Sequence, residues 1–156
     1  MTYLILKYLH IISAILLFGT GLGSAFYKWM ADRGGNVQNI AMTNKNVVLA
    51  DWLFTTPTVI FQPISGIWMA SIAHMPLTTP WIMWSLVLYV IAGLCWLPVV
   101  YIQIKMKNLS LVAMNHNTEL PPIYWNYAKI WFALGVPAFI AMILVVLLMT
   151  FKGIII

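Results

Sequence analysis

The sequence predicts an all-α fold, a bundle of four transmembrane helices with both termini on the non-cytoplasmic side. Of its 156 residues, 63% are hydrophobic and only 7% are charged, which excludes an ordinary soluble globule. Four apolar runs each exceed the about 20 residues that cross a hydrocarbon core. Because the core holds no water to satisfy the backbone, these runs should be helices. Basic residues are concentrated in two of the three connections, and this sets the orientation.

We expect the helices at about 3–27, 47–73, 80–105 and 123–151, within one integral membrane domain over residues 1–156. The connection around 74–80 has no Lys or Arg, whereas the other two connections hold five between them: Lys28, Arg33, Lys45, Lys105 and Lys107. By the positive-inside rule the two basic connections are cytoplasmic. The net charge of +5 is therefore a topology signal. It indicates a lipid bilayer as the partner and no nucleic acid.

The first helix carries an ionisable side chain inside its apolar run. His10 would lie about 10 Å below the outer boundary at 1.5 Å per residue. Steps of three and four place seven residues on its helical face: Lys7, His10, Ser13, Leu17, Thr20, Gly21 and Ser24. An ionisable group in a span normally faces a bundle interior or a wet cavity. The same helix contains Gly19-x-x-x-Gly23, a spacing that lets another helix approach closely and could support a homo-oligomer or a larger complex.

The second helix has the clearest polar stripe of the chain: Asp51, Thr55, Thr58, Gln62, Ser65 and Met69. Pro57 and Pro63 interrupt this helix and free backbone carbonyls that need other partners. The threonines suit either that structural task or a binding site. An acid near the cytoplasmic end of a span needs a cation, so we expect Asp51 to pair with Lys28 or Arg33 as a structural anchor.

The third helix is aromatic, and the fourth is largely featureless after Pro137. Tyr89 and Trp96 lie deep enough to line a pocket, although packing in the core is the commoner role of such residues. Residues 108–120 form the one sizeable polar loop that we expect, and a solvated His116 lies within it.

A buried histidine in a membrane bundle suits an axial haem ligand, because bundle cores hold cofactors between facing helices. On this interpretation His10 binds the iron of haem b, and Met69 or His74 is the opposite ligand. Gln62 and Thr58 line the cofactor site, and Lys7 meets a haem propionate. A lone membrane histidine is also a common hydrogen-bonding or proton-handling group. The residues alone leave both roles open.

Three stretches resemble a bacterial family of predicted integral membrane proteins of unknown function: LKYLHIISAILLFGTGLGSAF (6–26), ADWLFTTPTVIFQPISG (50–66) and WFALGVPAF (131–139). The Lys-x-x-His of the first stretch is also similar to HemJ-type protoporphyrinogen oxidases and, more distantly, to CopD-type membrane proteins. The HemJ-type resemblance implies a haem-ligating histidine at His10. This chain lacks the Leu-Pro-Arg that ends the first helix of that family and the lysine of its third helix. The resemblance therefore implies haem binding more strongly than porphyrinogen oxidation.

These observations predict a haem b-binding protein of the bacterial cytoplasmic (inner) membrane, multi-pass, with an electron-transfer or oxidoreductase-like role and a quinone as a possible redox partner. The alternative is a non-enzymatic small-solute or metal permease, or a packing subunit of a larger membrane complex. In a permease the polar stripes of the first two helices would form a hydrated path.

Overall fold

The computed structural model describes residues 1–152, and these form an all-α bundle. Its elements are α1 (Thr2–Gly34), α2 (Val37–Ala50), the π-helical turn η1 (Asp51–Thr55), α3 (Thr56–Ile72), α4 (Pro80–Asn115) and α5 (Pro122–Phe151). Within this part of the chain α2, η1 and α3 run on without a break, so four helical paths are long and apolar enough to cross a membrane. The prediction of an all-α bundle with four membrane-spanning helices is confirmed.

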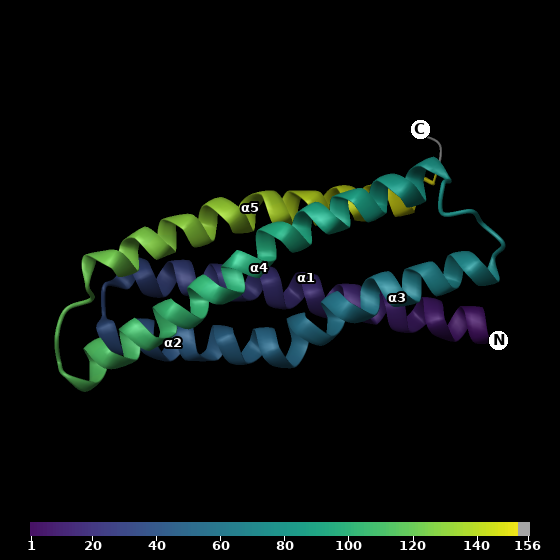
Figure 1. The fold of residues 1–156 in the computed structure, drawn as a ribbon. Coiled ribbons are helices and arrows are strands. Elements are labelled where there is room, and N and C mark those ends of the chain that lie inside the picture. The colour runs from purple at the N-terminus through teal and green to yellow at the C-terminus, as the bar shows by residue number, and fades with distance from the viewer. Residues whose placement is uncertain (153–156) are drawn as a thin grey trace.

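The bundle has two ends that differ in character (Figure 1). The N-terminus, the end of α5 and the connection 73–79 lie at one end, here called the terminal end. The short connections 35–36 and 116–121 lie at the other, the loop end. The helices that lead into them carry five of the eight basic residues, whereas Lys7 and Lys152 lie near the terminal end. The connections at the loop end are therefore flanked by more basic residues than the connection at the terminal end. Which end faces the cytoplasm stays a prediction.

The helices extend further at the loop end than expected. The predicted polar loop 108–120 is wrong over its first part, because α4 continues to Asn115. Likewise α1 continues to Gly34, where Gly35 ends it in the left-handed conformation (φ 66°). The reason is packing, since Ser110 and Ala113 are buried in the extension of α4. An apolar run identifies only the part of a helix that lies in hydrocarbon, so it misses an amphipathic continuation.

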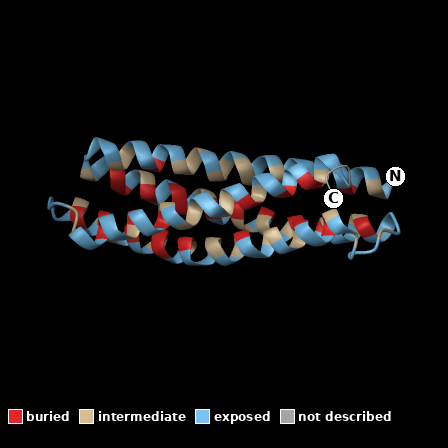
Figure 2. Ribbon diagram, turned by 90° about the horizontal axis from the view of Figure 1, so that it is seen from above, coloured by how far each residue is buried: buried red, intermediate tan, exposed pale blue. Residues whose placement is uncertain are grey.

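Helices pack in a pattern that changes along the bundle. α4 and α5 lie side by side towards the terminal end and diverge towards the loop end, where α2 packs against α4 (Figure 1). Towards the terminal end α1 packs mainly on α3, and this pair lies apart from the pair α4/α5 (Figure 1). Buried residues occupy the facing sides of the helices, and exposed residues cover the outward faces (Figure 2). The bundle is therefore closed at the loop end and divided into two helix pairs beyond it.

The closed end is organised around one tyrosine. Tyr124 at the start of α5 is fully buried among apolar residues of α2, α4 and α5: Ile40, Val99, Ile102, Met106, Ala128 and Trp131. Its hydroxyl group donates to Asp32 Oδ1 (2.7 Å) and accepts from Lys28 Nζ (3.1 Å) and from Asn44 Nδ2 (3.0 Å). One hydroxyl group thus connects α1, α2 and α5.

The surrounding polar groups complete this arrangement, here called the loop-end cluster: Lys28, Asp32, Asn44, Ser110 and Tyr124. Lys28 is 1% exposed and forms a salt bridge with Asp32 one turn along α1 (2.7 Å). Asn44 Nδ2 also donates to Ser110 Oγ on α4 (3.1 Å). A buried cation is tolerated only when it is paired and hydrogen-bonded, and Lys28 is both. The cluster joins all four helical paths.

The substitution Tyr124→Phe tests the importance of this cluster for stability. It removes the hydroxyl group and leaves Lys28, Asp32 and Asn44 each short of a buried partner. Such losses cost about 1–3 kcal/mol per orphaned group. We expect a free energy of unfolding, measured by denaturant titration in mixed micelles, that is lower by at least about 2 kcal/mol.

Tyr101→Phe is the matched control, because Tyr101 is 60% exposed on α4. It should leave the free energy of unfolding unchanged. Equal effects of the two substitutions would show that the loop-end cluster does not hold the helices together.

Candidate functional site

The path from α2 to α3 is shaped by a π-helical turn and two prolines. In η1 the N–H of Thr56 bonds to the carbonyl of Asp51, one residue wider than in an α-helix. Pro57 follows directly and has no N–H to continue the regular ladder. Such single π-turns often occur at functional sites. Here the turn brings Asp51 and Thr55 to the buried side of the bundle.

Pro63 has a consequence for the packing of α3 on α4. A proline in a helix leaves the carbonyl four residues earlier without its N–H partner, and for Pro63 this is Val59. Tyr89 of α4 donates its hydroxyl to the Val59 carbonyl at 2.6 Å. Tyr89 therefore satisfies the freed carbonyl and links the two helix pairs. Thr58 instead bonds to its own helical path, donating to the carbonyls of Phe54 (2.7 Å) and Thr55 (2.9 Å).

Asp51 does not pair with Lys28 or Arg33, so the predicted anchor is wrong. Lys28 already has Asp32 one turn away on the same helix, and the Arg33 guanidinium lies 4.9 Å from the centre of the Trp29 ring. Asp51 accepts from Thr55 Oγ1 at Oδ1 (2.7 Å) and from Gln103 Nε2 at Oδ2 (2.5 Å).

Trp131 completes the group around this acid. Its Nε1 donates to Gln103 Oε1 at 3.3 Å, so the carbonyl oxygen of that amide is also occupied. We call these four residues the Asp51 cluster: Asp51, Thr55, Gln103 and Trp131. It connects η1, α4 and α5 through neutral donors, and no cation contributes to it among the contacts of residues 1–152.

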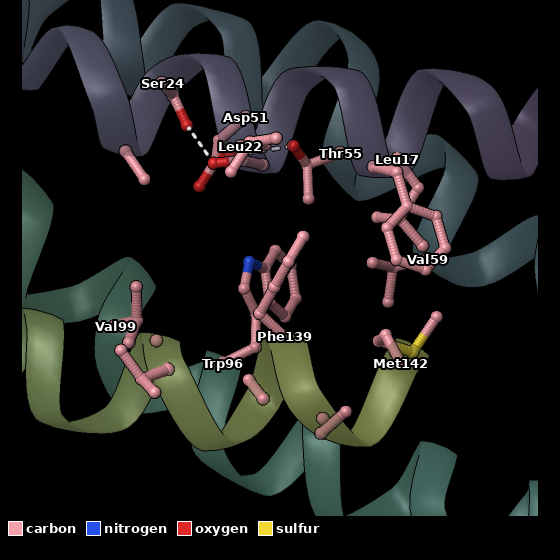
Figure 3. A pocket seen from close by; sticks show the side chains of 18 of the residues that line it. Leu17, Leu22, Ser24, Asp51, Thr55, Val59, Trp96, Val99, Phe139 and Met142 are labelled. Carbon is pink, nitrogen blue, oxygen red and sulfur yellow. Dashed lines mark hydrogen bonds between the residues drawn. The ribbon is translucent and has the colours of Figure 1, made fainter. Parts of the chain in front are cut away.

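A cavity of about 310 Å³ lies next to this cluster, between the two helix pairs (Figure 3). We call it the chamber. Leu17 and Val59 line it from one side, while Trp96 and Phe139 extend into it from α4 and α5 (Figure 3). Asp51 and Thr55 face these two rings across the space. The deep aromatic residues Tyr89 and Trp96 line this pocket, and the Asp51 cluster is its most polar part.

A second group of polar contacts joins α1 to α3 towards the terminal end. His10 is 9% exposed, and its Nδ1 lies 2.7 Å from Ser65 Oγ. Gln62 Nε2 donates to the backbone carbonyl of His10 at 2.9 Å. The carbonyl of Phe61 lies 2.7 Å from Ser65 Oγ. We call His10, Gln62 and Ser65 the His10 cluster.

The bonding pattern of this cluster allows two tautomers of the imidazole. A serine hydroxyl has one hydrogen to donate. Ser65 Oγ lies 2.7 Å from the carbonyl of Phe61 and 2.7 Å from Nδ1 of His10, so that hydrogen goes to one of the two. When it goes to the carbonyl, His10 donates Nδ1–H to Ser65, and Nε2 has the free lone pair that binding of a metal requires. The hydrogen bonds of His10 within the described part of the chain use Nδ1 and the backbone carbonyl, so Nε2 has no partner there.

Ser13 lies one turn along α1 from His10 and is also buried. Its hydroxyl oxygen is the one buried side-chain polar atom of residues 1–152 without a hydrogen-bond partner. A buried hydroxyl without a partner is costly in an apolar medium. Ser13 and Nε2 of His10 thus leave two unused hydrogen-bonding groups on neighbouring turns of one helix.

The other predicted site residues lie at different distances from His10. Gln62 contacts it directly, and the buried Thr58 lies one turn before Gln62 on α3. Met69 lies one turn beyond Ser65 and is half-buried. Lys7 is exposed on α1, and His74 is exposed in the turn after α3. The helix end does not fold inwards, so His74 is not part of the His10 cluster.

The polar stripes in the sequence predict which side chains are buried, but they do not predict which side chains bond to one another. Gln103 shares a helical face with Tyr89 and Trp96, but nothing in the sequence pairs it with Asp51. Gly19 and Gly23 mark no close approach inside the described chain, because a Cβ atom at either would meet nothing within 4 Å. Their use in an oligomer stays a prediction.

The family comparison agrees with this architecture. Residues 4–153 match the family described as "Predicted integral membrane protein (DUF2269)". The chain belongs to this family. It is an integral, multi-pass membrane protein. No curated protein and no solved structure matches it.

A double-mutant cycle tests the link between Pro63 and Tyr89. Tyr89→Phe should leave the Val59 carbonyl without a partner and lower the free energy of unfolding by about 1–3 kcal/mol. The same substitution in a Pro63→Ala background should cost clearly less, because the introduced alanine restores the N–H of the helix. Denaturant titrations of the four proteins give the coupling. Equal costs of Tyr89→Phe in both backgrounds would refute the link.

Proposed function

We propose that this protein binds haem b through His10 and has an electron-transfer or oxidoreductase-like role in the bacterial cytoplasmic membrane. The observation that carries the proposal is the state of the His10 ring. Its Nδ1 is held by Ser65, and its Nε2 is unbonded within residues 1–152. Histidine ligands of metals commonly donate their other ring N–H to a fixed partner, which sets the tautomer and the ring orientation.

The available donors fit haem better than a bare metal ion. Within the described residues no three His, Cys, Asp or Glu side chains come together as an ion-binding group. A single imidazole is sufficient for haem, because the porphyrin supplies four ligands of its own. When bound, haem supplies a one-electron carrier.

The residues around His10 would orient the ligand. Ser65 holds the ring through Nδ1, and Gln62 fixes the helix backbone at the same residue. A Cβ atom added to Gly66 would lie 3.6 Å from Cε1 of the ring, so α1 and α3 are in direct contact here. That contact leaves no slot for a flat macrocycle between these two helices. The cofactor must therefore approach from the Nε2 edge of the ring.

Of the two predicted second ligands, Met69 would be the one nearer to the His10 cluster, and it would have to reach the haem from beyond the contact between α1 and α3. It lies on the buried face of α3, one turn beyond Ser65, whereas His74 is exposed. Ser13, with its free hydroxyl group, lies on the His10 face of α1. Lys7 is exposed one turn before His10, a position from which a cation can meet a propionate at the membrane boundary.

A hydrated path between α1 and α3, as the permease alternative requires, has less support. The two polar stripes meet through direct hydrogen bonds that Ser65 and Gln62 form with His10. The redox partner that fits a membrane-embedded electron carrier is a lipid-soluble quinone.

We also propose that both termini lie on the non-cytoplasmic side of the membrane.

Absorption spectroscopy tests the proposal on protein expressed with haem supply and purified in detergent. The wild-type protein should show a Soret band. His10→Ala should abolish this band, because it removes the nitrogen that binds iron. Ser65→Ala should keep haem with affinity weakened by about 10–100-fold, the usual effect of losing a partner that orients a metal ligand.

His74→Ala and His116→Ala are the matched controls, because both histidines are exposed. Each should keep the full Soret band. Met69→Leu should shift the band and the reduced-minus-oxidised spectrum without abolishing binding. A wild-type protein without a Soret band, or a band that survives in His10→Ala, would overturn the proposal.

A further inference from the structure

We propose that the chamber is a binding site for an isoprenoid quinol, with the phenolic ring between α4/α5 and η1 and a hydroxyl group on Asp51. The site is separate from the His10 cluster, since His10, Gln62 and Ser65 do not line the chamber. Its volume of about 310 Å³ lies at the lower end of the range of about 300–1,000 Å³ typical of small-molecule sites. That volume suits a ring and the first part of a tail.

The walls of the chamber favour an aromatic, apolar ligand. Aromatic side chains from three helices line it: Phe18, Tyr89, Trp96, Trp131, Phe132 and Phe139. Trp96 and Phe139 extend into its middle, opposite Asp51 and Thr55 (Figure 3). Aromatic rings attract one another in offset and edge-to-face arrangements. A phenolic ring placed between these rings and the Asp51 cluster meets apolar walls and one polar end.

The polar end favours a head group that donates hydrogen bonds. A carboxylate accepts about four, and Asp51 receives two, from Thr55 and Gln103. The hydroxyl oxygens of Thr55 and Tyr89 donate to Asp51 and Val59, and each can still accept. The unused capacity around the chamber therefore consists chiefly of acceptors. A quinol brings O–H donors to them.

Charge separates a quinol from the phospholipids that surround the protein. A phosphate head would bring a full negative charge to a buried site whose bonded neighbours include no cation among residues 1–152, and an unpaired charge is costly in a medium of low dielectric constant. A quinol head is neutral, so it can reach Asp51 inside the bundle. Asp51 is 8% exposed and has no cation among its bonded neighbours in residues 1–152.

The chamber also has an opening through which a tail can reach lipid. Leu22 on α1 and Val136 and Ile140 on α5 line it, yet each is more than half exposed on the outer surface. They mark a gap between α1 and α5, beside the point where the rings of Phe18 and Phe139 meet (5.8 Å between centroids). An isoprenoid tail passing between Leu22 and Val136 would lie in the hydrocarbon core.

Gly93 provides a way to fill the chamber without disturbing the helices. It lines the chamber from α4, and a Cβ atom there would meet nothing within 4 Å. Gly93→Leu should therefore occupy ligand space while the fold is kept. Its neighbour Leu94 is 65% exposed on the outside of α4, so Leu94→Phe adds bulk away from the chamber.

The inference that the chamber binds a quinol depends on the chamber alone. Only the further step, electron transfer from the quinol, rests on the proposed haem function. The experiment is therefore made on two proteins in phosphatidylcholine nanodiscs, the wild type and His10→Ala. Radiolabelled decylubiquinol is titrated into each, and empty nanodiscs correct for partition into lipid. We expect saturable binding of one quinol per chain to both. Binding to His10→Ala without a Soret band would separate this inference from the haem proposal.

Variants then locate the bound quinol. Gly93→Leu should abolish saturable binding, and Leu94→Phe should leave the Kd unchanged. Asp51→Asn should weaken binding by about tenfold, because it replaces one of the two oxygens with an NH2 group, which cannot accept a hydrogen bond from the quinol. Circular dichroism confirms that each variant is folded. If Asp51→Asn does not fold, Gly93→Leu and Leu94→Phe still decide the question.

The proposal is overturned if the wild type shows no saturable quinol binding or if Gly93→Leu leaves the Kd unchanged. It is also overturned if dodecanol, which has a hydroxyl group and a tail but no ring, competes with decylubiquinol as well as unlabelled decylubiquinol does. Phospholipid that copurifies with the protein and is not displaced by decylubiquinol would show that the chamber holds structural lipid, and this too would overturn it.

Discussion

Polar side chains buried in the bundle have no water to bond with, and this constraint governs the architecture. The chain carries few such groups, and most of them meet in three clusters. The loop-end cluster around Tyr124 connects all four helical paths. The Asp51 cluster connects η1 to α4 and α5, and the His10 cluster connects α1 to α3. Because lipid tails are as apolar as leucine, packing and these bonds, rather than burial from water, hold the helices in register.

The clusters are unevenly spread along the bundle, and this gives the protein its internal space. The loop-end cluster closes one end tightly, and beyond it the helices separate into the pairs α1/α3 and α4/α5 (Figure 1). Tyr89 bridges the pairs because Pro63 leaves the Val59 carbonyl free to accept its hydroxyl. The chamber lies between the pairs. Pro63 thus shapes the chamber indirectly, because it frees the carbonyl that holds Tyr89 in the chamber wall.

Much of the fold was predictable from the sequence, because the long apolar runs and the stripes of polar residues at steps of three and four follow from membrane thickness and helix geometry. The buried faces of His10, Gln62 and Asp51 were found in this way. Pairings were not, because Asp51 and Gln103 are far apart in the chain and nothing local connects them. The sequence predicts Lys28 or Arg33 as the partner of Asp51, but Lys28 pairs with Asp32, four residues away on the same helix. The extension of α4 to Asn115 was missed because hydropathy detects the membrane, not the amphipathic end of a helix.

The central claim is that Nε2 of His10 is a free ligand position, held ready by Ser65. An experimental structure of the protein purified from its native membrane tests this most directly. The account predicts the density of a planar macrocycle with its metal on Nε2 of His10, approaching from the edge that faces away from Ser65. Density that shows Nε2 bonded to another side chain or to a water molecule, with no macrocycle beside it, would contradict the account.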